Sequence, residues 1–353
     1  MDDRITRGMG WTIGLDLGDR FCEGCVLAED GEVVERFRVR TRRGDLEKRL
    51  GSYAPSRVIL EVGTHSPWIS RVVSACGHQA IVANPRRVRL IAANDSKSDT
   101  VDAELLARLG RIDPSLLKPI VHRGEQAQRD RILIQARDGF VKARTQLVNQ
   151  ARGFAKSLGT KLPSCSTPTF TKKVRVAVGE DLFPGLSTIL TMIDQLTEQI
   201  RGMDREIERL CREQYPETER LREVPGVGAL TALCFVLTIE DPGRFAKSRS
   251  VGAYLGLRPR QRDSGEFRPQ LRITKAGDRL LRRLLVTSAH YVLGPFGPDT
   301  DLRRWGLRLA ERGGKAAKKR AVVAVARRLA VLLHRLWVTD EPYARVLDER
   351  AAA

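Results

Sequence analysis

Two carboxylates stand in predicted β-strands where the neighbouring residues are small or apolar. Asp16 lies in the sequence GLDLG (14–18), and because side chains alternate along a strand, it shares a face with Gly14 and Gly18. These two positions without a side chain leave room beside the carboxylate for a cation and a phosphate. Glu61 ends a run of three apolar residues, where strand propensity favours another apolar residue.

A second pair of carboxylates, Asp99 and Asp102, lies at a predicted helix start, and their spacing places them on one helix face. Carboxylate oxygens suit Mg²⁺, which keeps much of its water when bound. Two such ions about 3.5–4 Å apart would hold the attacking and leaving oxygens of a phosphodiester. The alternative is structural, since Asp near turns and at helix starts is common. We take Asp16, Glu61, Asp99 and Asp102 together as a predicted magnesium site.

Ser264 lies in an arginine-rich stretch that favours a different chemistry, nucleophilic attack on phosphorus. A Ser-Gly pair in a loop usually forms a turn. Here Arg258, Arg260, Arg262 and Arg268 surround it, and guanidinium groups bind a phosphate and stabilise its extra charge in a transition state. From these residues alone, both the turn and the nucleophile remain open.

The sequence VPGVG (224–228), before a predicted helix, resembles a helix-hairpin-helix turn. Backbone N–H groups at Gly226 and Gly228 would bind a phosphate in such a turn, and a plain helix start is the alternative. Lys275 is a further candidate phosphate contact.

Two other motifs have structural explanations that we favour. His65 lies close to Glu61 and is either a metal or proton participant or an ordinary hydrogen-bonded histidine at a helix start. Cys22 and Cys25 form a CxxC motif, but no second Cys/His pair lies at zinc-finger spacing. We therefore expect two small side chains in a strand.

The composition indicates a polyanionic partner. The 353 residues contain 62 Lys+Arg and 43 Asp+Glu, for a formal net charge of +19, and residues 242–353 hold 25 of the former and 10 of the latter. We therefore predict that this last third binds nucleic-acid phosphates, although a basic surface without a partner is the alternative. The charged N-terminus, sparse cysteines and lack of a long apolar run predict a cytoplasmic protein without a secretory signal or membrane span.

The elements that position these residues change along the chain. Residues 1–122 predict an α/β domain with a mixed sheet. Its strands are expected at 13–18, 21–27, 32–39, 58–62 and 80–83, with a helix at 66–76 capped by Ser66. Residues 220–353 predict a mainly α-helical domain that ends in a basic amphipathic helix at 315–337.

Residues 123–219 predict an antiparallel coiled-coil hairpin with arms of roughly 35–40 Å, because apolar residues recur at heptad spacing in two segments. The expected seam of the first helix is Leu133, Ala136, Phe140, Ala143, Leu147, Ala151, Phe154 and Leu158. That of the second is Leu186, Ile189, Ile193, Leu196, Ile200, Met203, Ile207 and Leu210. Such a hairpin can serve for oligomerisation or as a spacer between domains.

Taken together, the motifs resemble DEDD transposases of the insertion-sequence-110 family, in that family's order and over nearly the whole chain. They are GLDLG (14–18), LEVGT (60–64), KSDTVDA (97–103), VPGVG (224–228), RF (244–245), AYLGLRPR (253–260), SG (264–265), ITKAGD (273–278) and LLRRLL (280–285). The resemblance implies an RNase H-like (RuvC-like) N-terminal domain whose Asp16, Glu61, Asp99 and Asp102 bind Mg²⁺. It also implies a C-terminal transposase domain whose Ser264 attacks a phosphodiester and forms a phosphoserine link.

The resemblance further implies a set of partners. A structured bridge RNA would base-pair with donor and target DNA, a homodimer would combine its protomers in one active site, and two dimers would form a tetramer at the nucleoid of a prokaryotic cell. Two alternatives to this DNA recombinase are a RuvC-like structure-specific endonuclease in which water attacks, and an inert remnant that binds nucleic acid. The complete set of carboxylates and the Ser-Gly pair argue against a remnant.

Overall fold

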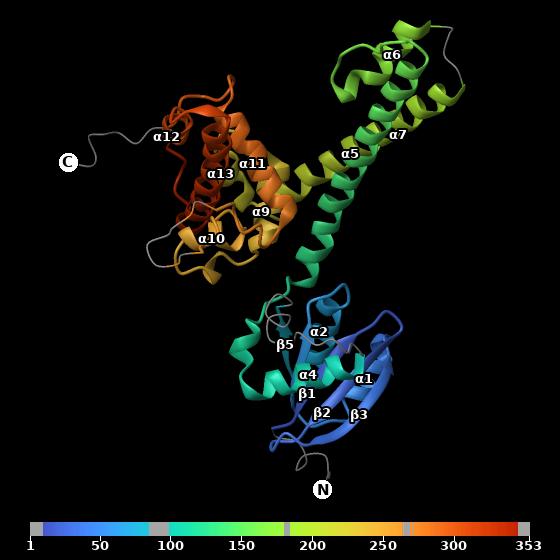
Figure 1. The fold of residues 1–353 in the computed structure, drawn as a ribbon, viewed down its shortest axis with the longest axis vertical. Coiled ribbons are helices and arrows are strands. Elements are labelled where there is room, and N and C mark those ends of the chain that lie inside the picture. The colour runs from blue at the N-terminus through green and yellow to red at the C-terminus, as the bar shows by residue number, and fades with distance from the viewer. Residues whose placement is uncertain are drawn as a thin grey trace, which may run out of the picture. The chain divides into compact units, whose positions relative to one another are not determined.

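The computed structural model describes residues 10–84, 99–179, 184–262, 264, 269 and 271–344. The chain divides into two compact units, Met1–Arg123 and Gly124–Ala353, which are blue to cyan and green to red in Figure 1. Each unit has a hydrophobic core of its own.

The N-terminal unit is built on a five-stranded mixed sheet with the strand order β3-β2-β1-β4-β5. Its elements are β1 (Thr12–Leu17), β2 (Phe21–Leu27), β3 (Val33–Arg40), α1 (Arg43–Leu50), β4 (Arg57–Glu61), α2 (Ser66–Ala75), β5 (Gln79–Ala83) and α4 (Asp99–Ile112). Strands β1, β2 and β3 pair antiparallel, whereas β1, β4 and β5 pair parallel. This is the mixed sheet that the sequence predicts, and it is consistent with an RNase H-like fold.

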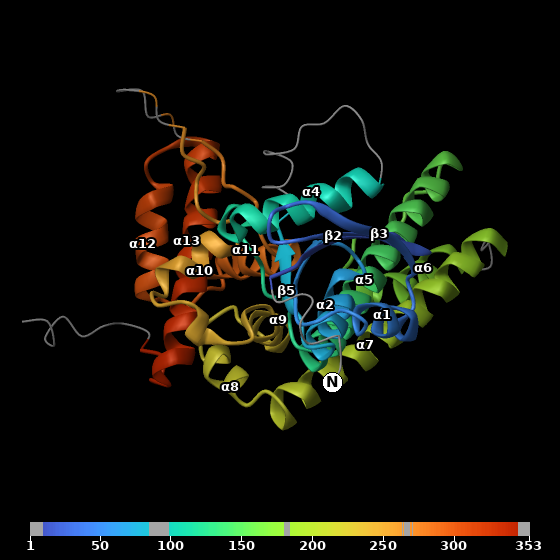
Figure 2. The same ribbon diagram turned by 90° about the horizontal axis from the view of Figure 1, so that it is seen from below.

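Helices cover both faces of this sheet, as Figure 2 shows with α4 on one side and α1 and α2 on the other. Ile13 and Leu15 of β1 are fully buried in the core beneath α1 and α2. Ala103 and Ala107 of α4 pack on the opposite face, together with Cys25. Strand β1 therefore contacts a core on each of its faces. Because side chains alternate along the strand, Ile13 and Leu15 point to one face and Asp16 lies on the other.

Two details of this unit differ from the prediction. Helix α1 was not expected, because it is mostly charged and buries only Leu46 and Leu50. Ser66 is the first residue of α2 and His65 is its N-cap. The Ser66 hydroxyl instead accepts a hydrogen bond from the Gly63 N–H (3.0 Å) and donates one to the Gly63 carbonyl (2.9 Å).

The C-terminal unit begins with a long hairpin of α5 (Glu125–Ser157) and α7 (Pro184–Glu213), with α6 (Phe170–Val178) at its outer end (Figure 1). The helices have 33 and 30 residues, so they are about 50 and 45 Å long, longer than the predicted arms. Arg137 Nε donates to Asp204 Oδ1 (2.7 Å), and Arg144 Nη1 donates to Thr197 Oγ1 (3.2 Å). Because one residue number rises while the other falls, the helices are antiparallel.

The buried seam of α5 lies one residue away from most of the predicted seam. Phe154 and Leu158 were expected inside but are 45% and 65% exposed. Of the predicted positions only Ala151 is buried, and the other buried apolar residues of this helix are Ala127, Ile134, Val148 and Ala155. Arginines at positions 137 and 144 occupy the seam, and a search for apolar residues therefore selects their neighbours.

Five of the eight predicted seam residues of α7 are buried. Leu186, Ile193, Ile200, Ile207 and Leu210 are buried as expected. Between them, Leu190 and Thr197 are buried, in place of the predicted Ile189 and Leu196. As in α5, a polar residue at a seam position misled the prediction.

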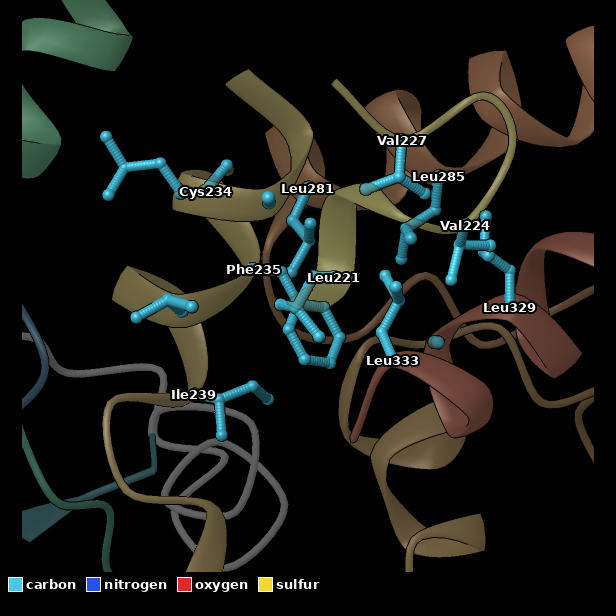
Figure 3. Close-up of a cluster of buried hydrophobic side chains, with 14 of the residues drawn as sticks. Leu221, Val224, Val227, Cys234, Phe235, Ile239, Leu281, Leu285, Leu329 and Leu333 are labelled. Atoms are coloured by element: carbon cyan, nitrogen blue, oxygen red, sulfur yellow. The ribbon is translucent and has the colours of Figure 1, made fainter. Parts of the chain in front are cut away.

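The rest of the unit packs around α9 (Ala229–Ile239), an apolar helix whose residues 231–239 are all buried. In Figure 3, Phe235 of α9 lies among side chains of α8 (Glu217–Arg222), α11 (Arg279–Leu293) and α13 (Gly314–Thr339). Helices α10 (Arg249–Tyr254) and α12 (Asp301–Ala310) pack against α13. Helix α13 is the basic amphipathic helix that the sequence predicts.

Candidate functional site

Asp16 lies on the face of β1 that α4 covers. An added Cβ at Gly14 would come within 1.9 Å of the Ala103 carbonyl oxygen and 2.6 Å of the Ala107 nitrogen. The backbone of α4 therefore touches the sheet two residues from Asp16. This close approach explains one of the two glycines that flank the carboxylate. It also brings the start of α4, with Asp99 and Asp102, to the same side of the sheet as Asp16.

The four predicted carboxylates are electrostatic neighbours. The pKa of Asp16 is raised to about 6, first by burial and then by the charges of Asp99 and Asp102. The charge of Glu61 raises the pKa of Asp16 by a smaller amount, whereas a hydrogen bond from the Leu17 backbone lowers it. Folding thus brings together carboxylates from β1, the end of β4 and the start of α4, and their mutual repulsion is the property that a cation relieves.

These carboxylates are neighbours and not a preformed cage. In the described part of the chain, no three His, Cys, Asp or Glu side chains are grouped tightly enough to hold an ion. The two observations agree, because Coulomb repulsion acts over longer distances than a metal–oxygen bond. A donor set of this kind fits Mg²⁺, which binds through one or two carboxylates and retains several waters.

A fifth carboxylate, which the sequence analysis did not select, lies beside this group. Glu23 is the partner of Asp16 in the β1–β2 ladder, so the two side chains lie on the same face. Its Oε1 is 2.9 Å from Arg38 Nε, and this ion pair balances its charge. The strand register, which the sequence alone did not provide, is the signal that identifies it.

The structure gives the histidine ordinary hydrogen bonds and places the two cysteines in separate environments. His65 Nε2 lies 3.1 Å from Asp19 Oδ1, and its Nδ1 accepts a hydrogen bond from the Trp68 indole (3.2 Å). Cys22 and Cys25 are both buried, but Cys22 belongs to the core under α1 and α2, whereas Cys25 faces α4. Two thiols on opposite faces of a sheet cannot share one ion.

Ser264 lies in the C-terminal unit, in a loop closed by a short two-stranded stem. The Arg260 N–H donates to the Arg272 carbonyl (3.0 Å), and the Thr274 N–H donates to the Arg258 carbonyl (2.9 Å). The serine and the predicted phosphate-binding Arg258, Arg260 and Arg262 are exposed. Arg268, the fourth predicted arginine, lies outside the described residues.

A set of close backbone contacts anchors this stem. Gly256 and Gly277 have positive φ angles (69° and 66°), and an added Cβ at Gly256 would come within 2.3 Å of the Ala276 backbone. Arg282 Nη1 donates to the carbonyls of Leu255 (2.9 Å) and Ala276 (2.6 Å). These contacts give the AYLGLRPR, ITKAGD and LLRRLL motifs one common role, which is to hold the serine loop on α10 and α11.

Asp278 ties the same region to the long hairpin. One oxygen caps α11 by accepting the Leu281 N–H (2.7 Å), and the other accepts a hydrogen bond from Arg131 of α5. Arg131 also donates to the Thr238 hydroxyl of α9 (2.8 Å). The sequence analysis did not identify Arg131, because nothing in its local pattern distinguishes it from the other arginines of α5.

The VPGVG turn is also partly structural. Val224 and Val227 are buried, and the φ angle of Gly226 is +83°. An added Cβ at Gly226 would come within 2.9 Å of the Tyr291 ring, so the turn packs on α11. Gly228 is exposed at the N-cap of α9, and Lys275 is exposed at the end of the stem. Phosphate contacts at these positions stay predictions.

Comparisons with known proteins bear on what this arrangement does. A family model described as Transposase, of the DEDD IS110 type, matches residues 13–158, and the Transposase IS116/IS110/IS902 family model matches residues 218–301. Within the described residues, no helix is long and apolar enough to cross a membrane.

Three relatives illustrate the similarity. The transposase for insertion sequence element IS1328 of Yersinia enterocolitica is 30% identical over 78% of this chain and 82% of its own. The transposase for IS1111A of Coxiella burnetii is 27% identical over 94% of this chain and 90% of its own. The pilin gene-inverting protein of Moraxella bovis is 23% identical over 96% of this chain and 98% of its own. The chain therefore belongs to the IS116/IS110/IS902 family of DEDD transposases.

Proposed function

We propose that this protein is an insertion-sequence transposase that recombines DNA by metal-dependent strand cleavage, a phosphoserine intermediate and strand exchange, guided by an RNA. The observation that carries the proposal is the position of Asp16, partly buried on the sheet face that α4 covers and close to three like-charged neighbours, in a chain of the transposase family. A cation bound among the four carboxylates would relieve their mutual repulsion.

In this proposal Asp16, Glu61, Asp99 and Asp102 hold the metal ions, which we expect to be Mg²⁺. When bound, the ions would neutralise the charge of the scissile phosphate and polarise its oxygens. The carboxylates themselves keep the ions at the end of β4 and the start of α4. Gly14 sets how closely α4 and its two aspartates approach β1.

Ser264 is the proposed nucleophile. Its hydroxyl oxygen forms a bond to phosphorus, the bond from phosphorus to a deoxyribose oxygen breaks, and the serine proton ends on the released hydroxyl. Because one phosphodiester replaces another, the bond energy is conserved, and a hydroxyl of a second strand can reverse the step to complete strand exchange. The exposed Arg258, Arg260 and Arg262 beside the serine would hold the phosphate during both steps.

The guide and the assembly are proposed from the family resemblance. A bridge RNA would read donor and target DNA by base pairing, so the protein would need mainly phosphate contacts, and a net charge of +19 supports such contacts. The carboxylates belong to the N-terminal unit and Ser264 to the C-terminal unit. We propose that a homodimer combines them across protomers and that two dimers form a synaptic tetramer.

Covalent trapping tests the proposal. RNA that co-purifies with the protein is sequenced, and DNA complementary to its unpaired loops is labelled and incubated with the complex and Mg²⁺. We expect a protein–DNA adduct that survives denaturation in the wild type and not in Ser264→Ala, whereas the control Ser250→Ala, at an exposed serine of α10, keeps it. Cleavage without any adduct would support attack by water and contradict the serine mechanism.

A further inference from the structure

A groove in the C-terminal unit lies directly beside the serine loop. It has a volume of about 610 Å³, within the range of small-ligand sites. One wall is the stem of the serine loop, including Leu271, Arg272 and Ile273, and the other is the first half of α13, with Leu309 of α12 between them. The groove is therefore built from the same stem that Arg282 and the two glycines anchor.

The floor of the groove is apolar because of small side chains on α13. Ala317, Ala321 and Ala324 recur at four- and three-residue spacing, so they share one helix face and leave space above it. Ile273 and Leu309 complete the floor. These two residues and Ala324 are only partly buried, whereas Ala317 and Ala321 are buried at its base. An apolar surface left accessible in this way favours an occupant with an apolar face.

Cations line the rim of the groove. The charged residues around it are all basic, namely Arg272, Lys275, Arg312, Lys319, Arg320 and Arg327. All six are exposed. A site with an apolar floor and a cationic rim fits a molecule that has flat apolar groups along an anionic backbone.

We infer that this groove binds an unpaired nucleotide of the strand that Ser264 attacks, with the base and sugar on the alanine floor and the flanking phosphates on the rim. This inference rests on the proposed function and adds its substrate class. Duplexes hide the faces of their bases by stacking, whereas a single strand exposes them to such a floor. The groove therefore favours single-stranded over double-stranded nucleic acid.

The distance along the chain supports a connection with the serine. Ser264 is four residues from Arg260 of the stem, so their Cα atoms are at most about 14 Å apart. A strand in the groove would then pass within a few nucleotides of the serine. Its phosphate contacts would position the scissile phosphodiester without touching the metal-binding unit.

The test measures binding without cleavage, in EDTA and in a Ser264→Ala background. The probes are a fluorescein-labelled single-stranded DNA, the same sequence as RNA, and its DNA duplex. Ala324→Phe fills the floor without a change of charge, and Val338→Phe is the matched control, since Val338 is exposed on the same helix outside the groove. We expect Ala324→Phe to weaken single-strand binding about tenfold and duplex binding less than twofold, and Val338→Phe to change neither.

The charge of the rim gives a second, independent readout. Lys319→Gln should lower the salt dependence of single-strand binding by about 0.7 in the slope of log K against log salt, whereas Lys315→Gln, outside the groove, should leave it unchanged. If both variants lower it equally, or if Ala324→Phe weakens duplex and single strand alike, the groove is part of a general basic surface and the inference is wrong.

Two further outcomes are decisive. Weaker binding of the single-stranded DNA supports the inference, whereas weaker binding of the RNA alone overturns it, because the strand that Ser264 attacks is DNA. A poly-glutamate peptide of equal charge should compete less strongly than single-stranded DNA. If the two compete equally, the inference is overturned in favour of an acidic protein segment as the ligand. These measurements need no cleavage, so they are independent of the trapping experiment. If the wild-type protein cleaves DNA without forming a covalent adduct, the serine mechanism is refuted while binding in the groove still stands.

Discussion

Replacing Asp16 by Asn should stabilise the metal-free protein at neutral pH, although it removes a proposed ligand. Asn has nearly the same shape as Asp and carries no charge, so it removes the repulsion from Asp99, Asp102 and Glu61 without opening a cavity. A residue kept for metal binding is expected to destabilise the fold when the metal is absent. The prediction therefore separates a metal site from a structural carboxylate.

The sign and magnitude follow from the pKa of Asp16. It is about 6 in the folded protein against 3.8 as the ordinary value, so the folded state holds the proton more tightly. Stability from this group is complete below about pH 4 and is lost as pH rises through 6. Each pH unit between the two pKa values is worth about 1.4 kcal/mol, which gives an upper limit of about 3 kcal/mol. Because the carboxyl is only partly buried, we expect about 1–2 kcal/mol.

Urea unfolding in EDTA measures this difference. Trp11 and Trp68 lie in the N-terminal unit and Trp305 and Trp337 in the other, so a Trp305→Phe/Trp337→Phe background restricts the fluorescence signal to the unit of interest. Asp16→Asn should be more stable than its parent at about pH 7.5 and equal to it near pH 4.

The matched control is Asp45→Asn, which changes an exposed aspartate of the same unit. It should shift stability by no more than a few tenths of a kcal/mol. Mg²⁺ should stabilise the parent protein more than Asp16→Asn, since a cation favours the ionised carboxyl. If Asp16→Asn is no more stable than the parent at about pH 7.5, the proposed repulsion among the carboxylates is refuted.

Three further predictions involve residues of the C-terminal unit. A mixture of Ser264→Ala and Asp16→Asn proteins should regain part of the recombination that each lacks, and complete failure despite verified subunit exchange would favour a site within one chain. Asp at both Ile193 and Ile200, which are 1% and 3% exposed, should cost several kcal/mol and lower the melting temperature or the oligomeric state measured by light scattering. Arg258→Gln with Arg260→Gln should reduce the salt slope of duplex binding by about 1.8, and an unchanged slope would place the phosphate contacts elsewhere.

The strands of the N-terminal unit could be predicted because short segments of alternating or apolar residues between turn signals indicate β-strands. The Asp30-Gly31 turn illustrates this, since Gly31 has a φ of +92° between β2 and β3. The face of Asp16 followed from the same alternation. Helix α1 could not be predicted, because its burial of two leucines is too small a signal among charged residues.

The seam of the hairpin and the surroundings of the site depended on contacts between distant segments. Arg144 and Thr197 satisfy each other only once α5 and α7 are paired, so neither looks like an interior residue in the sequence. Arg131 and Glu23 were missed for the same reason. The composition of a groove likewise depends on which helix faces which loop, and no local pattern contains that information.

The two polar pairs across the hairpin have a mechanical consequence. The pairs of Arg137 with Asp204 and of Arg144 with Thr197 form only in the observed register of the two helices. The length of the α5–α7 hairpin can therefore change only in fixed steps. Only matched additions of about seven residues to both helices return its tip to the same orientation, in increments of about 10 Å. A family of such chains would differ in reach by discrete steps and not by continuous variation.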